Sequence, residues 1–422
     1  MKTLVIGTGG REHALALALS RDPSVTEVHA APGNPGIGEV ATLHDLDPLD
    51  GIAVADLAQA LGVDLVVIGP EAPLVAGVAD TVRERGISCF GPSREAAALE
   101  GSKAFAKEVM AAAGVPTADA RVCESAATVA RALDEFGPPY VVKDDGLAAG
   151  KGVVVTEDRD AAVAHAAQCS RVVVEEYLDG PEVSLFAITD GYTVYPLLPA
   201  QDFKRIFDAD EGPNTGGMGA YTPLSWAPEG LVDEVLDSVL RPTVEEMAAR
   251  DTPFAGLLYA GLALTSQGVR VVEFNARFGD PETQPLLALL DSSLAELLEA
   301  AAVGRLHEVE APRWRSGAAV AVVMASAGYP EGSSKGDVIV GTETLAEERD
   351  VDVIHAGTAR RDGDLVTAGG RVLAVTAVGG DVADARAKAY EGISSISFPG
   401  AQWRTDIAAG TPVSTSEAEV SR

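Results

Sequence analysis

Residues 4–12 read Leu4-Val5-Ile6-Gly7-Thr8-Gly9-Gly10-Arg11-Glu12, a short apolar run that ends in glycines just before a helix-forming segment. Such a run is typical of a buried strand, and the leucine- and alanine-rich residues 11–19 are typical of a helix. Farther along, apolar runs and helix-forming stretches alternate at 25–30, 54–61, 64–68, 75–85 and 87–90. This alternation predicts a doubly wound parallel sheet over about the first hundred residues.

The pattern changes beyond this region. A helix is expected over 102–113, followed by strands, a helix and a glycine-rich loop that indicate a small α+β lobe. More strands then accompany two expected helices, at 231–249 and 286–302. The apolar run 317–325 opens a last unit, which ends in a polar tail that we expect to be disordered.

The composition limits the class of protein. The chain of 422 residues is long enough for roughly three domains, and 47% hydrophobic residues exclude a wholly disordered chain. Basic residues number 32 and acidic residues 63, and the net charge of −31 argues against a nucleic-acid or membrane partner. The three cysteines form no CxxC pair, and no secretory leader or 18-residue apolar run is found. We therefore expect a cytoplasmic protein without a disulfide framework or cysteine-ligated zinc.

The glycines at 7–10 lie at a strand-to-helix turn, where backbone N–H groups can hold an anion. A dinucleotide site needs a third glycine where Glu12 stands and an acidic residue where residues 30–32 read Ala-Ala-Pro. NAD binding is therefore disfavoured. A site for a smaller phosphate and a tight turn without a ligand both remain open.

A second glycine-rich stretch, residues 141–155, reads Val-Val-Lys-Asp-Asp-Gly-Leu-Ala-Ala-Gly-Lys-Gly-Val-Val-Val. It does not match the Walker loop, because Gly152 follows Lys151 where that motif needs serine or threonine. Two strands around a lysine-bearing loop suit a flap that covers a polyphosphate. A plain hairpin with exposed lysines is the alternative.

Two further stretches set polar residues beside apolar ones. In 172–182 an apolar strand runs into paired glutamates, which could form a hinge against an adenine edge with Glu182 at a ribose. An acidic surface corner is the commoner alternative. Residues 201–219 combine charges with glycines, and Lys204 could meet an anion there, although an ordinary surface loop explains the pattern as well.

The stretch 271–284 is the most informative and reads Val-Val-Glu-Phe-Asn-Ala-Arg-Phe-Gly-Asp-Pro-Glu-Thr-Gln. On a strand, Glu273, Asn275 and Arg277 alternate with apolar residues and share one face. A carboxylate and an amide oxygen can hold Mg²⁺, and an arginine beside them can clamp a carboxylate or phosphate. A cross-strand salt bridge is the competing explanation.

Motifs in this order resemble those of the ATP-grasp ligases, and within them the phosphoribosylamine–glycine ligases. They are Gly-Thr-Gly-Gly-Arg-Glu-His at 7–13, Gly-Asn-Pro-Gly at 33–36, Gly-Pro-Glu-Ala-Pro-Leu at 69–74, Asp-Gly-Leu-Ala-Ala-Gly-Lys-Gly at 145–152, Gly-Pro-Asn-Thr-Gly-Gly-Met-Gly-Ala-Tyr at 212–221 and Glu-Phe-Asn-Ala-Arg-Phe-Gly-Asp-Pro-Glu at 273–282. Several long matches in one order are more specific than a single glycine motif. The resemblance extends from Met1 to about Trp403.

The resemblance implies an α/β and α+β multidomain fold with an N-terminal doubly wound parallel sheet, ATP-grasp lobes and a small C-terminal domain. The expected divisions are an N-terminal substrate-binding domain at 1–101, a central ATP-grasp domain at 102–121 plus 191–312, its flap lobe at 122–190, a C-terminal domain at 313–409 and a disordered tail at 410–422.

The resemblance also implies an enzyme that uses ATP, with Mg²⁺ or Mn²⁺, to join glycine to 5-phosphoribosylamine through a glycyl phosphate. The products are glycinamide ribonucleotide, ADP and phosphate, in the second step of purine synthesis. We expect a monomer. Another ATP-grasp carboxylate–amine ligase, a carboxylase of the same superfamily and a nucleotide-binding protein without activity are the alternatives. A pocket at Asn34 and Glu71 that suits a ribose phosphate would distinguish a phosphoribosylamine–glycine ligase from these alternatives.

The resemblance further implies roles for individual residues. Those expected at ATP are Lys103, Lys143, Lys151 of the flap, Glu175, Leu178 and Glu182. Those expected at the ribosylamine are Gly9, Asn34, Gly36 and Glu71, with Asp202 and Lys204 reaching from the central domain. The expected metal ligands are Glu273 and Asn275, and Asp280 is expected at the amine of glycine. Arg277, which would stabilise the transferring phosphoryl group, and Asp202 are the expected catalytic residues.

Overall fold

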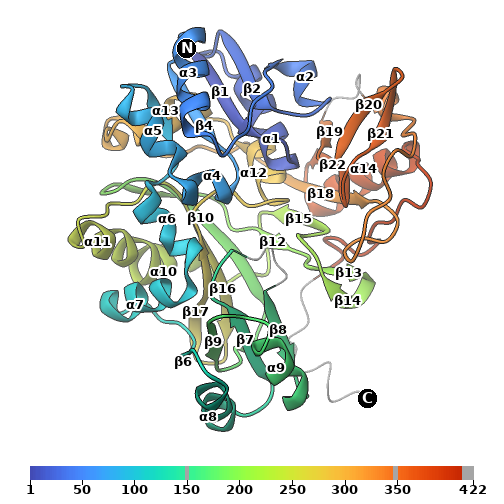
Figure 1. Cartoon of the computed structure of the whole chain (residues 1–422). Helices are drawn as coiled ribbons and strands as arrows, with labels where there is room; N and C mark the ends of the chain where they lie inside the picture. The colour runs from blue at the N-terminus through green and yellow to red at the C-terminus, as the bar shows by residue number, and fades with distance from the viewer. Residues whose placement is uncertain (148–151, 346–349, 411–422) are drawn as a thin grey trace.

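The computed structural model describes residues 1–147, 152–345 and 350–410. N-terminal, central and C-terminal parts form a body, and a smaller lobe, residues 120–175, projects from it (Figure 1). Lys151 and the expected tail beyond residue 410 lie outside the described residues. Among the helices described, none is long and apolar enough to cross a membrane.

The first hundred residues form the predicted doubly wound sheet. Its strands lie in the order β3-β2-β1-β4-β5, and each neighbouring pair is parallel. They are β1 (Lys2–Gly7), β2 (Glu27–Pro32), β3 (Thr42–Leu43), β4 (Leu65–Ile68) and β5 (Ser88–Phe90). The helices are α1 (Gly10–Arg21), α2 (Ile37–Val40), α3 (Gly51–Leu61), α4 (Glu71–Ala76), α5 (Val78–Glu84) and α6 (Arg94–Gly101). Residues 4–6 are fully buried, which fits a central strand covered on both faces.

Three expected helices are interrupted. The segment 75–85 is split into α4 and α5 at Gly77, whose φ of 84° is accessible to glycine at little cost. The segment 231–249 contains a π-helical turn, η2 (Leu236–Leu240), between α10 (Leu231–Val235) and α11 (Arg241–Ala249). The segment 286–302 is divided between α12 (Thr283–Leu289) and α13 (Leu294–Ala302), because Ser293 caps the second helix.

The central part and the projecting lobe each contain an antiparallel sheet. The central sheet has the order β11-β10-β16-β17, from β10 (Glu182–Asp190), β11 (Val194–Pro196), β16 (Ala255–Thr265) and β17 (Gly268–Asn275), with α7 (Lys103–Ala113) nearby. The lobe has the order β6-β9-β7-β8, from β6 (Ala120–Cys123), β7 (Tyr140–Asp144), β8 (Val153–Thr156) and β9 (Val172–Glu175), with α8 (Ala126–Phe136) and α9 (Arg159–Ala166). Strands β7 and β8 pair antiparallel around the glycine-rich loop.

A further five-stranded sheet joins the central and C-terminal parts. Its order is β12-β15-β18-β22-β19, from β12 (Gln201–Asp202), β15 (Gly219–Thr222), β18 (Ala318–Ala325), β22 (Arg371–Gly379) and β19 (Val351–His355). Helix α14 (Val382–Ser395) packs on β18 and β22. Short elements complete the chain: β13 (Arg205–Phe207), η1 (Asp208–Asp210), β14 (Glu211–Asn214), η3 (Leu306–Glu308), η4 (Thr342–Leu345), β20 (Thr358–Arg361) and β21 (Asp364–Thr367). Strands β12 and β15 therefore tie the polar segment 201–222 to the C-terminal part.

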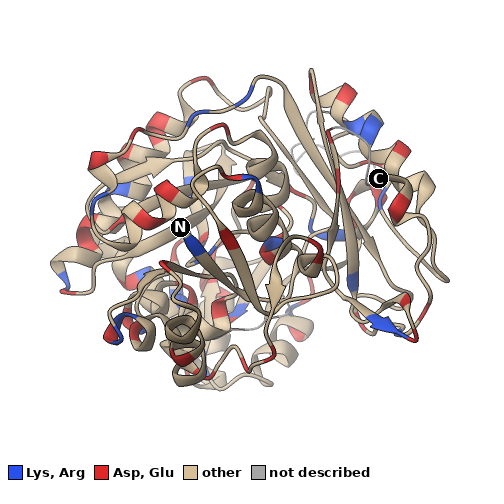
Figure 2. Ribbon diagram, turned by 90° about the horizontal axis from the view of Figure 1, so that it is seen from above, with Lys and Arg blue, Asp and Glu red and all other residues tan. Residues whose placement is uncertain are grey.

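The charged residues are spread over the outside of this framework. Figure 2 shows Asp and Glu distributed along the outer helices and loops, with Lys and Arg scattered among them. A large apolar cluster runs from β1 through the central sheet to α14. The net charge of −31 is therefore a dispersed surface charge over a shared core.

The N-terminal and C-terminal parts meet at two buried histidines, His13 and His355. The backbone N–H of His355 donates to Nδ1 of His13 (2.7 Å), and the ring centroids are 5.6 Å apart. A β-carbon at Gly36 would come within 2.5 Å of both rings. Burial keeps both imidazoles neutral, since it lowers the pKa of His13 from 6.5 to about 3 and the pKa of His355 to about 4.

We predict that the protein loses stability as the pH falls from 6.5 towards 4, because in this range the unfolded chain protonates both histidines and the folded chain does not. Each histidine should contribute up to roughly 1.4 kcal/mol per pH unit. His13→Asn keeps a hydrogen-bond acceptor without the titration, so its thermal midpoint should depend less steeply on pH. Midpoint curves that stay parallel for wild type and variant would contradict this account.

Candidate active site

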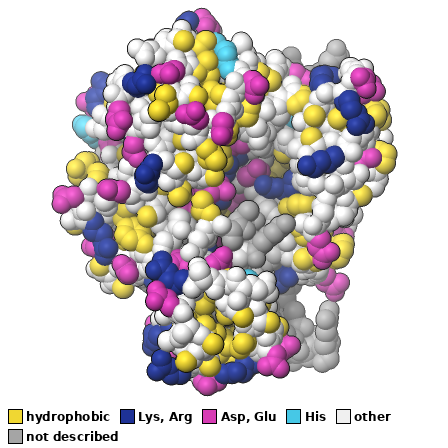
Figure 3. Space-filling model, in the orientation of Figure 1, with side chains coloured by type: hydrophobic (Ala, Val, Ile, Leu, Met, Phe, Trp, Pro, Cys, Tyr) yellow, Lys and Arg dark blue, Asp and Glu magenta, His cyan; other side chains and the backbone are white. Residues whose placement is uncertain are grey.

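The polar residues of the central motifs gather around β17 and the ends of β10 and β12. Strand pairing sets Gly261 opposite Glu273 and Tyr259 opposite Asn275, and Ser184 of β10 pairs with Ala200 just before β12. The motif residues near positions 182, 202 and 273 are thereby brought together. Figure 3 shows a hollow between the body and the projecting lobe, with acidic and basic side chains around it.

Arg277, just beyond β17, connects this region to the N-terminal part. Its guanidinium forms ion pairs with Glu71 (3.2 Å) and Glu100 (3.2 Å), and it donates to the carbonyl of Phe278 (3.2 Å). Burial opposes the charge, but Glu100 and Glu71 outweigh burial and raise the pKa of Arg277 above its ordinary value. Glu71, expected at the ribosylamine, is therefore also a partner of the expected catalytic arginine.

The sequence did not predict a role for Glu100. Its side chain is 8% exposed, and besides pairing with Arg277 it accepts a hydrogen bond from the backbone N–H of Ala276 (2.7 Å). Burial raises the pKa of its carboxyl group although Arg277 opposes this. Glu100 stands near the end of an alanine-rich helix and belongs to no motif, so nothing in the sequence distinguishes it from a surface glutamate.

Glu175, at the end of β9, neutralises two lysines. Its carboxylate pairs with Lys143 of β7 (2.8 Å) and Lys107 of α7 (3.1 Å), and Lys143 also donates to the carbonyl of Val272 (2.9 Å). Burial lowers the pKa of Lys107, an effect that Glu175 opposes and Lys143 reinforces. The sequence did not predict that the carboxylate of Glu175 pairs with these lysines, and Lys107 belongs to no motif, so this three-residue cluster is a finding of the structure.

The structure describes three of the other residues expected at ATP. Lys103 begins α7, and its ammonium group donates to the carbonyl of Gly146 (3.1 Å) in the glycine-rich loop. Leu178 is half-buried in the connection after β9. Glu182 begins β10 and forms an ion pair with Lys204. Lys151, on the expected flap, is outside the described residues.

Lys204 and Glu273 are at the centre of the charge network. Burial lowers the pKa of Lys204, but carboxylates nearby raise it above its ordinary value; these are Glu182, Glu273 and Asp202. Burial raises the pKa of Glu273, and the surrounding cations lower it below its ordinary value; the largest effects come from Lys204, Lys143 and Lys103. Glu273 is therefore held as a carboxylate beside lysines from three separate segments of the chain.

Asp202 and Glu282 form an acidic pair beside this network. The buried Oδ1 atom of Asp202 has no hydrogen-bond partner among the described residues. Burial and Glu282 raise the pKa of Asp202 well above its ordinary value. Glu282 is 2% exposed and accepts hydrogen bonds from the hydroxyls of Tyr259 (2.8 Å) and Ser184 (3.1 Å). The sequence motif includes Glu282, but no role was predicted for it.

Asp280 is held from two directions. Arg371 of β22 pairs with its carboxylate (3.2 Å), and the side-chain amide of Gln284 donates to the other oxygen (2.9 Å). Burial raises the pKa of Asp280, but Arg371 and Arg11 lower it below its ordinary value. Arg371 lies 91 residues beyond Asp280 and outside every motif, so the sequence did not predict it.

The N-terminal residues expected at the ribosylamine form hydrogen bonds with neighbouring loops. The N–H of Gly9 donates to the carboxylate of Glu12 (2.6 Å), so this N–H already has a partner within the protein. The side-chain amide nitrogen of Asn34 donates to the carbonyls of Thr8 (2.8 Å) and His355 (3.0 Å). Its amide oxygen accepts a hydrogen bond from the N–H of Ile37 (2.9 Å). These contacts fix the loop, and the ligand roles of Gly9, Asn34 and Gly36 stay predictions.

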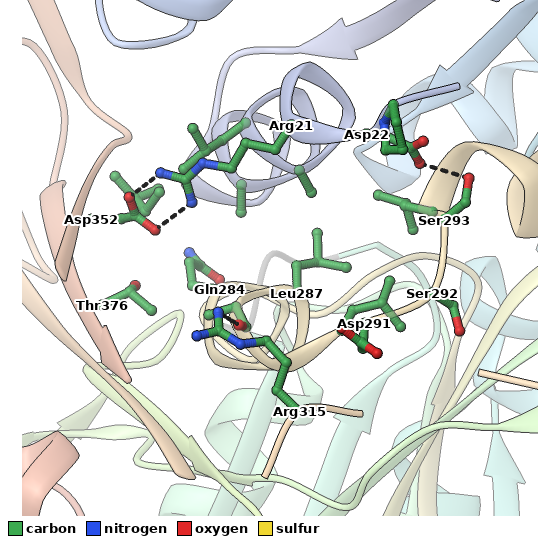
Figure 4. Close-up of a pocket in the computed structure, with 18 residues that line it drawn as sticks. Arg21, Asp22, Gln284, Leu287, Asp291, Ser292, Ser293, Arg315, Asp352 and Thr376 are labelled. Carbon is green, nitrogen blue, oxygen red and sulfur yellow. Dashed lines mark hydrogen bonds and ion pairs between the residues drawn. The ribbon is translucent and has the colours of Figure 1, made fainter. Parts of the chain in front are cut away.

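A separate cavity of about 280 Å³ lies where α1, the α12–α13 connection and the C-terminal sheet meet (Figure 4). The bidentate ion pair of Arg21 with Asp352 lines one side, and Arg315 lies across the cavity from it. Of the predicted site residues that the structure describes, none lines this cavity. Among the described lining residues, Gln284 connects the cavity to the network, because it donates to Asp280, and the cavity is therefore distinct from the candidate active site.

Three family models match the chain one after another. They are described as the N domain of phosphoribosylglycinamide synthetase, over residues 1–100, its ATP-grasp (A) domain, over 101–283, and its C domain, over 319–410.

Individual relatives agree with these models. A phosphoribosylamine–glycine ligase of Streptomyces coelicolor is 65% identical over 97% of this chain and 99% of its own length, and one of Mycobacterium bovis is 55% identical over 96% and 97%. The crystal structure of a phosphoribosylamine–glycine ligase from Thermotoga maritima, 33% identical, covers 96% of this chain and 100% of its own with a TM-score of 0.85. A biotin carboxylase domain from Hydrogenobacter thermophilus, 16% identical over 95% and 91% with a TM-score of 0.72, shares the fold alone. The chain belongs to the phosphoribosylamine–glycine ligase family of the ATP-grasp ligases.

Proposed function

We propose that this protein joins glycine to 5-phosphoribosylamine with ATP, giving glycinamide ribonucleotide, ADP and phosphate in the second step of purine synthesis. The observation that carries the proposal is the convergence at β17, where Glu273 lies among cationic side chains and Arg277 is held beside it; the cations with the largest effect are Lys204, Lys143 and Lys103. Membership of the phosphoribosylamine–glycine ligase family supports the choice of substrates.

The reaction needs such a concentration of cations. A carboxylate is a poor electrophile, because its leaving group would be oxide. Transfer of the γ-phosphoryl group of ATP to a carboxylate oxygen of glycine yields glycyl phosphate and ADP. The amine nitrogen of phosphoribosylamine then forms the new C–N bond, phosphate leaves with the C–O bond electrons, and the nitrogen loses a proton. The protein holds the reactants in line, neutralises the charge and excludes water from the acyl phosphate.

We infer that the ATP phosphates take the place of existing partners of the lysines. Lys143 is paired with Glu175 and Lys103 with a loop carbonyl, so each is poised near the glycine-rich loop without being an unpaired buried charge. Lys151 would act with them from the flap. Glu175 and Leu178 would meet adenine through the backbone, and Glu182 the ribose.

Glu273 and Asn275 fit a divalent cation. A carboxylate and an amide oxygen are hard ligands, and nearby lysines keep Glu273 ionised. In the described part of the chain, no group of three or more His, Cys, Asp or Glu side chains is arranged to hold a metal, so phosphate oxygens and water would have to complete the coordination. We infer that Mg²⁺ or Mn²⁺ binds here, where it would neutralise phosphate charge.

The remaining assignments concern the acceptor and the activated carboxylate. Arg277 would stabilise charge on the transferring phosphoryl group, and Asp202, with a raised pKa, would accept a proton near the amine. Asp280 would meet the amine of glycine. The ribosylamine would lie toward the N-terminal part, at Gly9, Asn34, Gly36, Glu71 and Lys204.

We also propose that the chain is divided into domains at 1–101, 102–121 plus 191–312, 122–190 and 313–409. We further propose that the protein is a cytoplasmic monomer. The competing function is that of another ATP-grasp carboxylate–amine ligase or a carboxylase, since a biotin carboxylase domain shares the fold. Co-substrate dependence separates these functions directly.

We predict that ADP release from ATP and a divalent cation requires both glycine and freshly prepared phosphoribosylamine, with glycinamide ribonucleotide formed in equal amount. Coupled-enzyme measurement of ADP and mass spectrometry of the product test this. Bicarbonate or another amine in place of the proposed co-substrates serves as the control. Turnover that follows one of these instead would refute the proposed substrates and retain the ATP-grasp fold.

We predict that Arg277→Ala costs about 2–4 kcal/mol of transition-state stabilisation, comparable with the loss of an oxyanion donor. Turnover should fall accordingly, while the thermal midpoint reports whether the fold survives. Arg270→Ala is the matched control, because Arg270 lies on β17, the strand that leads to Arg277, and pairs with Glu176 (2.6 Å) instead of Glu71 and Glu100. Arg277→Ala activity within twofold of wild type would remove Arg277 from the mechanism.

We predict that Glu273→Gln raises the Mg²⁺ concentration needed for half-maximal turnover by roughly tenfold or more, because the variant loses a charged ligand. Titration of Mg²⁺ at fixed ATP measures the shift. Glu176→Gln, which alters a carboxylate paired with Arg270, is the control. The same half-maximal concentration in wild type and Glu273→Gln would show that Glu273 holds no metal.

A further inference from the structure

Arg371, the first residue of β22, extends from the C-terminal part to two loops of the candidate active site. Its Nη1 atom donates to the carbonyls of Gly216, Gly217 (3.4 Å) and Asp280 (2.8 Å), and its Nη2 atom pairs with the carboxylate of Asp280 (3.2 Å). One guanidinium therefore binds the glycine loop at 215–217 and the Asp280 turn at the same time.

The glycine loop in turn holds the segment that carries Asp202. The backbone N–H of Thr215 donates to the carbonyl of Lys204 (2.7 Å), and the Thr215 hydroxyl donates to that carbonyl as well (2.8 Å). Asp202 pairs with Ala220 between β12 and β15. A β-carbon at Gly217 would lie 2.7 Å from Oδ1 of Asp202, so the loop passes directly against the unpartnered oxygen. A displaced loop would therefore move the surroundings of Asp202.

The C-terminal part supports the loop at a second point. The hydroxyl of Tyr329 accepts a hydrogen bond from the N–H of Gly216 (2.9 Å), and the guanidinium of Arg371 lies 3.0 Å from where a Gly216 β-carbon would be. The guanidinium can bind several carbonyls and a carboxylate from one position because its donors form a rigid planar fork. Lysine would keep the charge at Arg371 but lose this geometry.

We propose that Arg371 is a positioning residue that holds the Asp280 turn in place for glycine activation, together with the loop 215–217 that passes against Asp202, so that the C-terminal part completes the glycine side of the site. This inference rests on the proposed function. Neither the hydrogen bonds of Arg371 given above nor its ion pair involve a residue assigned to ATP. Its loss should therefore change the kinetics of glycine much more than those of ATP.

The test compares Arg371→Lys and Arg371→Ala with Arg386→Lys in the full-length protein. Arg386 is the matched control, because its guanidinium also binds backbone carbonyls, those of Ile407 (2.9 Å) and Thr405 (2.6 Å), but within the C-terminal part. We expect both Arg371 variants to lose roughly 10- to 100-fold in kcat/KM for glycine, since small misplacements of reacting groups have effects of this size. The KM for ATP should stay within twofold, and Arg386→Lys should keep wild-type kinetics.

Chemical rescue gives a readout that a general loss of stability would not produce. Added guanidinium ion at millimolar concentration should restore part of the turnover of Arg371→Ala, whereas methylammonium should not. Wild-type glycine kinetics in Arg371→Lys, or an equal loss for glycine and ATP without rescue, would overturn the proposal. The wild-type enzyme is assayed first, so that turnover without a requirement for glycine refutes the proposed function independently of Arg371.

Discussion

A guanidinium largely shielded from water needs anionic partners, and at Arg277, whose side chain is 18% exposed, this requirement connects the parts of the molecule. The partners come from the N-terminal part, Glu71 at the start of α4 and Glu100 near the end of α6, whereas Arg277 follows the central strand β17. Removing one partner from a buried pair typically costs about 3–5 kcal/mol. The N-terminal part and the central sheet therefore cannot separate without leaving charges unpaired, which keeps the expected metal ligands on β17 next to the expected ribosylamine region.

The same requirement explains the arrangement of the rest of the site. A site for a triphosphate and a carboxylate must present several cations, yet the free protein cannot leave buried cations without partners. Glu175 accordingly pairs with Lys143 and Lys107, and Arg371 pairs with Asp280. Substrates would exchange with these partners. Asp202 differs, because one of its oxygens is buried without a partner in the described structure, which suits a group that awaits a ligand or a proton.

Local patterns in the sequence were sufficient for much of the fold. The alternation of apolar runs with helical stretches correctly predicted the parallel N-terminal sheet, and the two apolar runs beside the glycine-rich stretch correctly predicted the strands β7 and β8. The helix predictions failed where a single residue ends one helix or begins the next: Gly77, with its left-handed backbone, lies between α4 and α5, and the hydroxyl of Ser293 caps the start of α13. Both residues lie within stretches whose overall composition favours a continuous helix.

The sequence by itself determined the secondary-structure pattern, the motifs and, through them, the family, because these depend on residues close together in the chain. Only the tertiary structure decided which charges are partners. Glu100 meets Arg277, Lys107 meets Glu175, and Arg371 meets Asp280 across large sequence separations. Burial and ion pairing depend on how distant segments pack, and a lone glutamate, lysine or arginine outside a motif reads the same whether it is exposed or buried against a partner.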